Sequence, residues 1–298
     1  NAGYRPPDDE ETRKRIRRAV SQAHEVGLRL HAWMTCWSLD GVPAAEIESL
    51  RRAGRVMRTA AGEPLDWLCP SHPANREHLL AALRGLAQSE VDGIHLDYVR
   101  YPGASGCYAD ATRAAFEQYR GDPVKDWPGA VQEGGALADD FRVFRESEIN
   151  AFVQAAAETL ARERPESTLS AAVFPAPFHH EHGQRWEVWL REGWIEFVAP
   201  MIYEREQDRF ANRLEQSLAL APAPERILAG IGTAADESQL DALGTARQVL
   251  AARENRCGGL AFFQLNADLL TEILPRMGFT NRTTGEADQG RAERPRRE

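Results

Sequence analysis

The 298-residue sequence lacks any apolar run approaching the roughly 18 residues that a membrane-spanning helix needs. It has few cysteines, and those present do not show the CxxC spacing of a thiolate zinc site. They are Cys36, Cys69, Cys107 and Cys257. A GxGxxG turn, which would cradle a dinucleotide phosphate, is also missing. We therefore expect no membrane span, no cysteine-based zinc site and no organic cofactor.

Basic residues are outnumbered by acidic ones, 36 Lys and Arg against 45 Asp and Glu. The formal net charge is −9, whereas a nucleic-acid partner requires a surplus of Lys and Arg to neutralise phosphates. Hydrophobic residues make up 43% of the chain and charged residues 27%, which is typical of a globular protein. The length suits one large α/β barrel or two smaller domains.

Hydrophobic periodicity predicts short strands that alternate with helices. Strands are expected at 28–33, 94–99, 168–174, 197–203, 226–232 and 259–265, with a weak one near 67–69. Helices are expected at 9–25, 75–88, 139–164, 209–220 and 238–255, with shorter ones near 112–119, 186–192 and 269–277. Such alternation is typical of βαβ units around a parallel sheet.

Two architectures fit this alternation. A doubly wound open sheet should show a glycine-rich turn after its first strand, and none occurs. We therefore predict a (β/α)8 TIM barrel over residues 1–279, with its first strand missing from this chain. Residues 280–298, rich in Arg, Glu and Gly, are expected to form a disordered tail.

The active site of such a barrel lies at the carboxyl ends of its strands. Polar and aromatic residues follow several predicted strands, although core packing does not require them there. They are His31, Trp33, His72, Asp97, Arg100, Tyr101, Tyr203, Glu204, Gln264 and Asn266. A substrate with ring faces and hydroxyl groups would use such side chains.

The most informative segment is DGIHLDYVRYPG, residues 92–103. Strand alternation places His95 and Asp97 on one face, with Asp97 near the strand end. A carboxylate inside a barrel is costly unless it is hydrogen-bonded or used in chemistry. Asp97 is thus either a structural group held by Arg100 or His95, or a nucleophile or stabiliser of positive charge at a sugar carbon.

This segment resembles the signature of the family-10-like glycosyl hydrolases, a group of bacterial, often secreted, barrel proteins. Four further blocks are similar to that family in the expected order: AHEVGLRLHAWMTCW (23–37), WLCPSHPANREHLL (67–80), FVAPMIYE (197–204) and GGLAFFQLN (258–266). The family's first strand has no counterpart here. The resemblance implies a barrel glycoside hydrolase in an extracytoplasmic or secreted location.

A more distant resemblance is to the family 18 chitinase-like hydrolases, which carry DGxDxDxE on strand four and MxYD on strand six. The same frame here keeps the aspartate as Asp97, but Val99 stands where that family has its acid glutamate. The chitinase mechanism is therefore not carried over, and the proton donor has to be sought elsewhere.

Glycoside hydrolysis normally uses two carboxyl groups. Glu204 is our choice for the proton donor because it ends a predicted strand after Tyr203. The alternative is that strand alternation turns Glu204 outward. Glu181 and then Asp40 are substitutes, while Asp268 is expected to cap a helix instead.

The other candidates are assigned to substrate binding: His31, Trp33, His72, His95, Arg100, Tyr101, Tyr203, Gln264 and Asn266. Three of the histidines come singly from different strands without HxH or HExxH spacing, so hydrogen bonding is favoured over metal binding. A second group of histidines, at 179, 180 and 182, is interpreted as a substrate rim or solvated loop rather than a metal site.

The sequence therefore predicts a glycoside hydrolase that cleaves a polysaccharide or oligosaccharide with Asp97 and Glu204. The partner is a carbohydrate. A carbohydrate-binding barrel without catalysis is the alternative, favoured by Val99 in place of an acid. A metal-dependent hydrolase or deacetylase is a third hypothesis, favoured only by the histidines.

Overall fold

The computed structural model describes residues 9–103 and 106–277. The chain divides into two compact units, Asn1–Val198 and Ala199–Glu298, which are described separately below. The predicted tail at 280–298 lies outside the described residues, and the expected domain limit at residue 279 stays a prediction. Among the described residues, no helix has the length and hydropathy needed to cross a bilayer.

Helix α1 (Glu10–Glu25) opens the described part of unit 1. The side chain of Asp9 accepts a hydrogen bond from the backbone N–H of Thr12 at 2.7 Å and so caps the helix. Two glutamates in its first turn stabilise the helix, because their negative charges lie at the positive end of the helix dipole. The chain leaves the helix at Gly27, whose φ of +72° is readily adopted only by glycine.

A parallel sheet forms the centre of unit 1, and its last strand ends two residues beyond Val198. It contains β1 (His31–Thr35), β4 (Gly93–Asp97), β5 (Thr168–Val173) and β6 (Phe197–Pro200), in that order. β1 and β4 are in register from His31 opposite Gly93 to Thr35 opposite Asp97. Gly93 is required, because a Cβ there would lie 2.5 Å from the His31 ring and 2.8 Å from the carbonyl oxygen of Thr168. The predicted alternation of parallel strands with helices is confirmed.

The segment after β1 differs from the prediction. It contains helix α2 (Ala44–Arg52) and an antiparallel ribbon of β2 (Val56–Arg58) and β3 (Pro64–Leu68). The strand near Trp67, which was expected to belong to the parallel series, pairs with β2 instead, and β1 is hydrogen-bonded directly to β4. α2 and β2 were not predicted from this polar, glycine-rich stretch, because both are short and depend on tertiary contacts.

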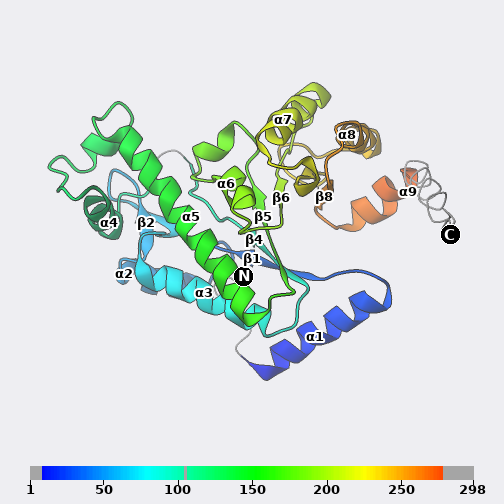
Figure 1. The fold of residues 1–298 in the computed structure, drawn as a ribbon, viewed down its shortest axis with the longest axis horizontal. Helices are drawn as coiled ribbons and strands as arrows, with labels where there is room; N and C mark the ends of the chain where they lie inside the picture. Colours follow the sequence, from blue (N-terminus) through cyan, green and yellow to red (C-terminus); the bar gives the residue numbers. More distant parts are fainter. Residues whose placement is uncertain (1–8, 104–105, 278–298) are drawn as a thin grey trace, which may run out of the picture. The chain divides into compact units, whose positions relative to one another are not determined.

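Further helices follow in unit 1. They are α3 (Pro73–Ala87), α4 (Asp110–Arg120), α5 (Ala138–Glu163) and α6 (Trp186–Arg191), with 3-10 turns η1 (Gly129–Val131) and η2 (Phe178–His180). α3 and α5 pack against each other, and α5 is the long green helix in Figure 1. An aromatic cluster of Phe116, Phe141 and Phe144 joins α4 to α5.

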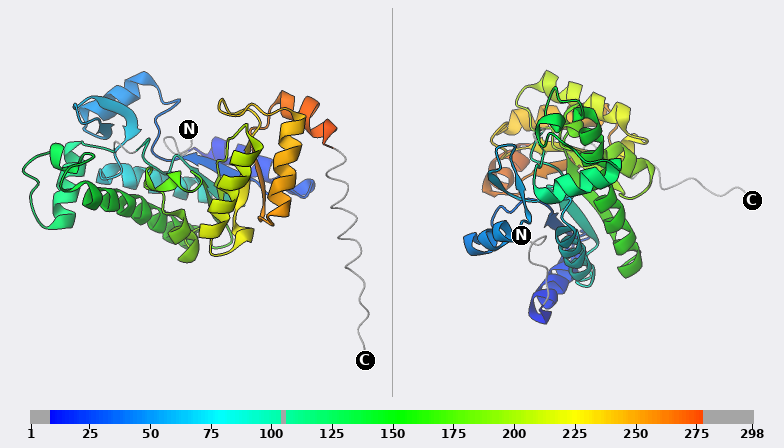
Figure 2. Two further views of the ribbon diagram at one scale, coloured as in Figure 1. Left: turned by 90° about the horizontal axis from the view of Figure 1, so that it is seen from above. Right: turned by 90° about the vertical axis from the view of Figure 1, so that its left-hand side faces the viewer.

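Unit 2 repeats the strand–helix alternation. β7 (Leu228–Gly232) and β8 (Gly259–Phe263) are parallel, and Met201, directly after β6, bridges to Gly230 of β7. Helices α7 (Gln207–Leu220) and α8 (Ala242–Glu254) pack side by side, as Figure 2 shows in yellow and orange. The short elements η3 (Pro224–Arg226), η4 (Leu269–Ile273) and α9 (Leu274–Arg276) complete this unit.

Candidate active site

Asp97 is the last residue of β4, at the carboxyl end of the parallel sheet. Its Oδ2 accepts a hydrogen bond from the indole Nε1 of Trp33 at 3.0 Å, and its Oδ1 accepts one from the backbone N–H of Tyr98 at 2.6 Å. Tyr98 has a φ of +51°, which is uncommon for a residue with a side chain. This turn directs the N–H of Tyr98 to the preceding carboxylate.

The surroundings of Asp97 act on its charge in opposite directions. Burial raises the pKa of the Asp97 carboxyl. The hydrogen bonds from Tyr98 and Trp33, together with the positive charge of Arg100, act against that rise. The result is a half-buried carboxylate whose two oxygens are each held by an N–H donor, as a nucleophile or electrostatic stabiliser would require.

Arg100 lies in an aromatic cage. Its guanidinium carbon is 5.2 Å from the ring centroid of Trp67, 4.9 Å from that of Tyr98 and 4.8 Å from that of Phe174. Such contacts stabilise a cation while leaving its charge effective nearby. Arg100 therefore supplies positive potential beside Asp97 without a direct ion pair among the contacts of the described residues.

Trp67 and Phe174 are members of this site that were not predicted from the sequence. Each lies at or just after the end of a strand, β3 and β5 respectively. An aromatic residue at a strand end was the available signal for both, but Trp67 was predicted only as part of a strand. His182, from the loop after β5, stacks on Phe174 with ring centroids 3.8 Å apart and bonds the carbonyl oxygen of Tyr101.

Tyr101 does not fit its predicted binding role. It is 0% exposed, and the guanidinium of Arg145 lies 4.3 Å from its ring centroid. A ring covered in this way belongs to the core of unit 1 and has no free face for a sugar. Trp33, in contrast, is 57% exposed and keeps an open ring face beside Asp97.

The three strand-associated histidines are not brought to Asp97 as a group. His31 begins β1, four residues before Thr35, which is about 13 Å along a strand. His95 lies two residues before Asp97 on β4, and its Nδ1 forms a hydrogen bond of 2.8 Å with the hydroxyl oxygen of Ser170. Burial lowers the pKa of His95 to about 4, so its ring is neutral at pH 7.

His72 stands at the start of α3, where burial and the nearby charge of Arg55 lower its pKa. The nearby residues Arg55 and Asn75 belong to a hydrogen-bond network. Asn75 accepts a hydrogen bond from Nε of Arg55 at 2.7 Å and donates to the carbonyl oxygens of Arg55 and Cys69. These bonds tie the β2–β3 ribbon to α3.

The candidates of unit 2 have partners of their own. Glu204 is partly buried and forms an ion pair with Arg213 of α7. Tyr203 stacks on Phe263 of β8 with ring centroids 5.5 Å apart. The Glu204 carboxylate is therefore positioned by a charged partner on α7.

Gln264 and Asn266 follow β8. Gln264 is exposed. The side-chain oxygen of Asn266 accepts from the backbone N–H of Leu269 at 2.9 Å, so this amide caps the following turn. Asp268, which was expected to cap it, makes no such bond. The cap at Asn266 leaves its amide nitrogen for other contacts.

The alternative carboxylates lie in unit 1. Asp40 is exposed, and its negative charge contributes to raising the pKa of Tyr98, after the larger effects of burial and Asp97. Glu181 is exposed in the loop after β5. Val99, at the position of the chitinase acid, is fully buried and belongs to the core.

The loop histidines differ from their interpretation as a solvated rim. His179 is buried, with 1% exposure, and its Nε2 lies 3.7 Å from Oε2 of Glu187. His180 is partly exposed and its Nδ1 bonds Glu146 at 3.1 Å. Glu146 and Glu187 were not predicted from the sequence, since they come from α5 and α6 rather than from the loop.

Solved structures with the same fold are TIM-barrel glycoside hydrolases. A β-galactosidase from a Rahnella species is matched with a TM-score of 0.66 and 14% identity, over 96% of this chain and 49% of that one. A catalytic mutant of a family 42 β-galactosidase from G. stearothermophilus is matched with a TM-score of 0.62 and 12% identity, over 84% of this chain and 43% of that one. The predicted (β/α)8 barrel class is thereby confirmed.

The family is shown by sequence. Residues 6–235 match the family described as Glycosyl hydrolase-like 10, and the chain belongs to it. An S-layer-related protein of Niallia circulans is 28% identical over 123 residues, which cover 38% of this chain and 8% of that protein. The chain thus spans less than half of the matched β-galactosidases and a small part of this relative.

Proposed function

We propose that this chain is the catalytic barrel of a glycoside hydrolase that cleaves a polysaccharide or oligosaccharide, with Asp97 as its central carboxylate. The single observation that supports this most is the placement of Asp97 at the end of β4, with an N–H donor on each oxygen and the exposed Trp33 beside it. The fold and the family agree with this class of reaction.

In the proposed reaction, the ionised Asp97 attacks the anomeric carbon or stabilises the positive charge that develops there. The open face of Trp33 would stack on a sugar ring next to the bond that breaks. Arg100 favours the charged form of Asp97, because a cation near a carboxyl group opposes its protonation. His95, two residues before Asp97 on β4, is fixed by its hydrogen bond with Ser170 of β5.

Glu204 remains the proposed proton donor. It belongs to unit 2, and the support for it is chemical: a second carboxyl group is needed, and Glu204 follows shortly after a strand of the parallel series. Its ion pair with Arg213 would have to loosen when it carries a proton. Asp40 and Glu181 are the substitutes if Glu204 is dispensable.

Reducing-end release from a broad glycan panel tests the proposal. The protein is compared with its Asp97→Asn and Glu204→Gln variants, each checked for folding and for glycan binding. We expect Asp97→Asn to fall at least about 1,000-fold in rate while it still binds. Activity that survives Asp97→Asn would contradict the role of Asp97, and activity that survives Glu204→Gln would move the acid role to Asp40 or Glu181.

A carbohydrate-binding barrel without catalysis is the second candidate. It is favoured by Val99 at the position of the chitinase acid and by the ion pair that already occupies Glu204. Binding of one glycan by both the parent protein and Asp97→Asn, with no cleavage by either, would support it.

A further inference from the structure

The loop after β5 and the start of α6 contain buried polar atoms that lack hydrogen-bond partners. Both ring nitrogens of His179 and Oε2 of Glu187 are inaccessible to solvent and have no hydrogen-bond partner among the described residues. An unpaired buried donor or acceptor costs about 1–3 kcal/mol, and folded proteins rarely leave several together. Buried polar atoms grouped in this way are commonly satisfied by a bound water molecule or ion.

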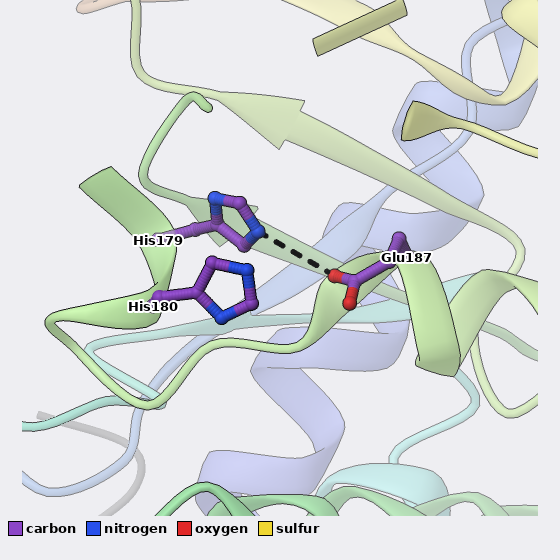
Figure 3. Close-up of side chains that lie close together, drawn as sticks. All are labelled: His179, His180 and Glu187. Atoms are coloured by element: carbon purple, nitrogen blue, oxygen red, sulfur yellow. Dashed lines mark ion pairs between the residues drawn. The ribbon is translucent and has the colours of Figure 1, made fainter. Parts of the chain in front are cut away.

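The geometry of the cluster suits a metal ion. His179, His180 and Glu187 each offer one ligand atom, and these atoms all lie within 4.8 Å of one another. Nε2 of His179 and Oε2 of Glu187 are 3.7 Å apart, close to the separation of about 3.3 Å between two ligands of tetrahedral zinc. Figure 3 shows the two imidazole rings side by side, with a nitrogen of each on the side of the Glu187 carboxylate.

Neighbouring groups orient two of these side chains. Nδ1 of His180 bonds Oε1 of the buried Glu146 at 3.1 Å, which leaves Nε2 of His180 for the ion. A carboxylate behind a ligating histidine is the usual outer partner in metal sites, where it sets the tautomer and the ring direction. Nε of Arg185 donates to Oε1 of Glu187 at 2.5 Å, so the other oxygen, Oε2, faces His179.

We propose that His179, His180 and Glu187 bind a divalent transition-metal ion of the zinc type. A set of two imidazoles and one carboxylate binds zinc in preference to calcium or magnesium, which favour oxygen ligands. From the sequence alone, these histidines are interpreted as a substrate rim or solvated loop rather than a metal site. The ligands become a set only when the start of α6 brings Glu187 to the loop.

The ion would hold the loop after β5 in place. His179 and His180 lie on η2, Glu187 lies on α6, and Glu146 extends the cluster to α5. The same loop begins at Phe174 and contains His182, both of which line the surroundings of Arg100. Metal binding is therefore expected to stabilise the loop whether or not the protein cleaves glycans.

The test uses Zn²⁺ alone and needs no glycan. Purified protein is stripped with a chelator, dialysed, and titrated with Zn²⁺ by calorimetry, with the bound metal counted by atomic emission. We expect one ion per chain and a higher Tm in its presence. Co²⁺ in place of Zn²⁺ should give the visible absorption bands of a four-coordinate site.

Variants locate the site. His179→Gln and Glu187→Gln should each weaken Zn²⁺ binding at least about 100-fold, and Glu146→Gln about 10-fold. His182→Gln is the matched control, since it changes a histidine of the same loop that is not in the cluster, and it should keep the metal. Circular dichroism confirms that each variant is folded.

Two results would overturn the proposal. One is a folded wild-type protein that takes up no Zn²⁺ or Co²⁺, which would assign the unpaired atoms to water. The other is undiminished Zn²⁺ affinity in the folded double variant His179→Gln/Glu187→Gln, which would place any bound metal elsewhere on the chain.

Discussion

Trp33 donates its indole N–H to Oδ2 of Asp97 across 3.0 Å, between adjacent parallel strands. The pair is made possible by the register of β1 and β4, in which Trp33 lies opposite His95 and Thr35 opposite Asp97. An exposed aromatic ring is thereby hydrogen-bonded to a half-buried carboxylate.

Trp33→Phe tests this pair. Phenylalanine keeps a ring but cannot donate, so the pKa of Asp97 should rise further, because a hydrogen bond that lowers it is lost. Since the ionised form acts in the proposed reaction, the acidic limb of the kcat/KM profile should move to higher pH. Activity near neutral pH should fall about 10-fold. Tyr119→Phe, at another exposed aromatic, is the control; an unshifted pH profile in Trp33→Phe would contradict the role of the indole.

Arg100→Lys tests the aromatic cage. Lysine keeps the positive charge but loses the planar guanidinium that faces Trp67, Tyr98 and Phe174. We expect the free energy of unfolding to drop by about 1–2 kcal/mol in urea denaturation. Arg120→Lys, which loses a contact with the single ring of Phe116 at 5.7 Å, should cost less. Equal losses in the two variants would show that the cage adds nothing.

His95 should make stability depend on pH. Its pKa in the folded protein is about 4, lowered from 6.5 mainly by burial and secondarily by His31. As pH falls from 6.5 towards 4, the unfolded chain takes up a proton that the folded chain refuses, so stability decreases. This pKa difference between the folded and unfolded states corresponds to a loss of about 3 kcal/mol of stability at low pH.

His95→Gln removes the titrating group while it keeps a side chain able to bond Ser170. Urea denaturation at pH 7 and at pH 4 should show a smaller loss of stability at low pH in the variant than in the parent. Identical losses would mean that the ring of His95 is protonated in the folded protein.

Asn75→Ala should destabilise unit 1. The side chain is fully buried and makes hydrogen bonds with Arg55 and Cys69, so its removal leaves buried polar groups unpaired. The expected cost is about 2–3 kcal/mol in chemical denaturation. Asn212→Ala, at an exposed position of α7, is the control and should change stability by less than about 0.5 kcal/mol. A similar small change in Asn75→Ala would show that this network is not structural.

Much of the architecture could be predicted from local pattern. The periodicity at 139–164 and at 168–174 predicted α5 and β5 to within a residue at each end. The segment around α2 and the β2–β3 ribbon could not be predicted, because short elements in a polar stretch take their structure from neighbours such as Trp37, whose carbonyl oxygen accepts from Leu68.

The candidate site shows the same division. The sequence pointed to Asp97, Trp33 and Arg100, because polar and aromatic groups at strand ends are not needed for packing. It also pointed to Tyr101, and only the packing of Arg145 against that ring showed that it is buried. Adjacent residues of one loop can face the core or the solvent, and sequence spacing outside regular elements does not distinguish them.

By itself, the sequence determined the barrel class and the aspartate at the end of β4, since strand–helix alternation and a charged residue at a strand end are local patterns. Only the tertiary structure decided which side chains meet: Trp67 and Phe174 around Arg100, and Glu146 and Glu187 around the loop histidines. These groups come from elements far apart in the chain. Their proximity depends on how the helices and the β2–β3 ribbon pack around the sheet, and local periodicity carries no information about that packing.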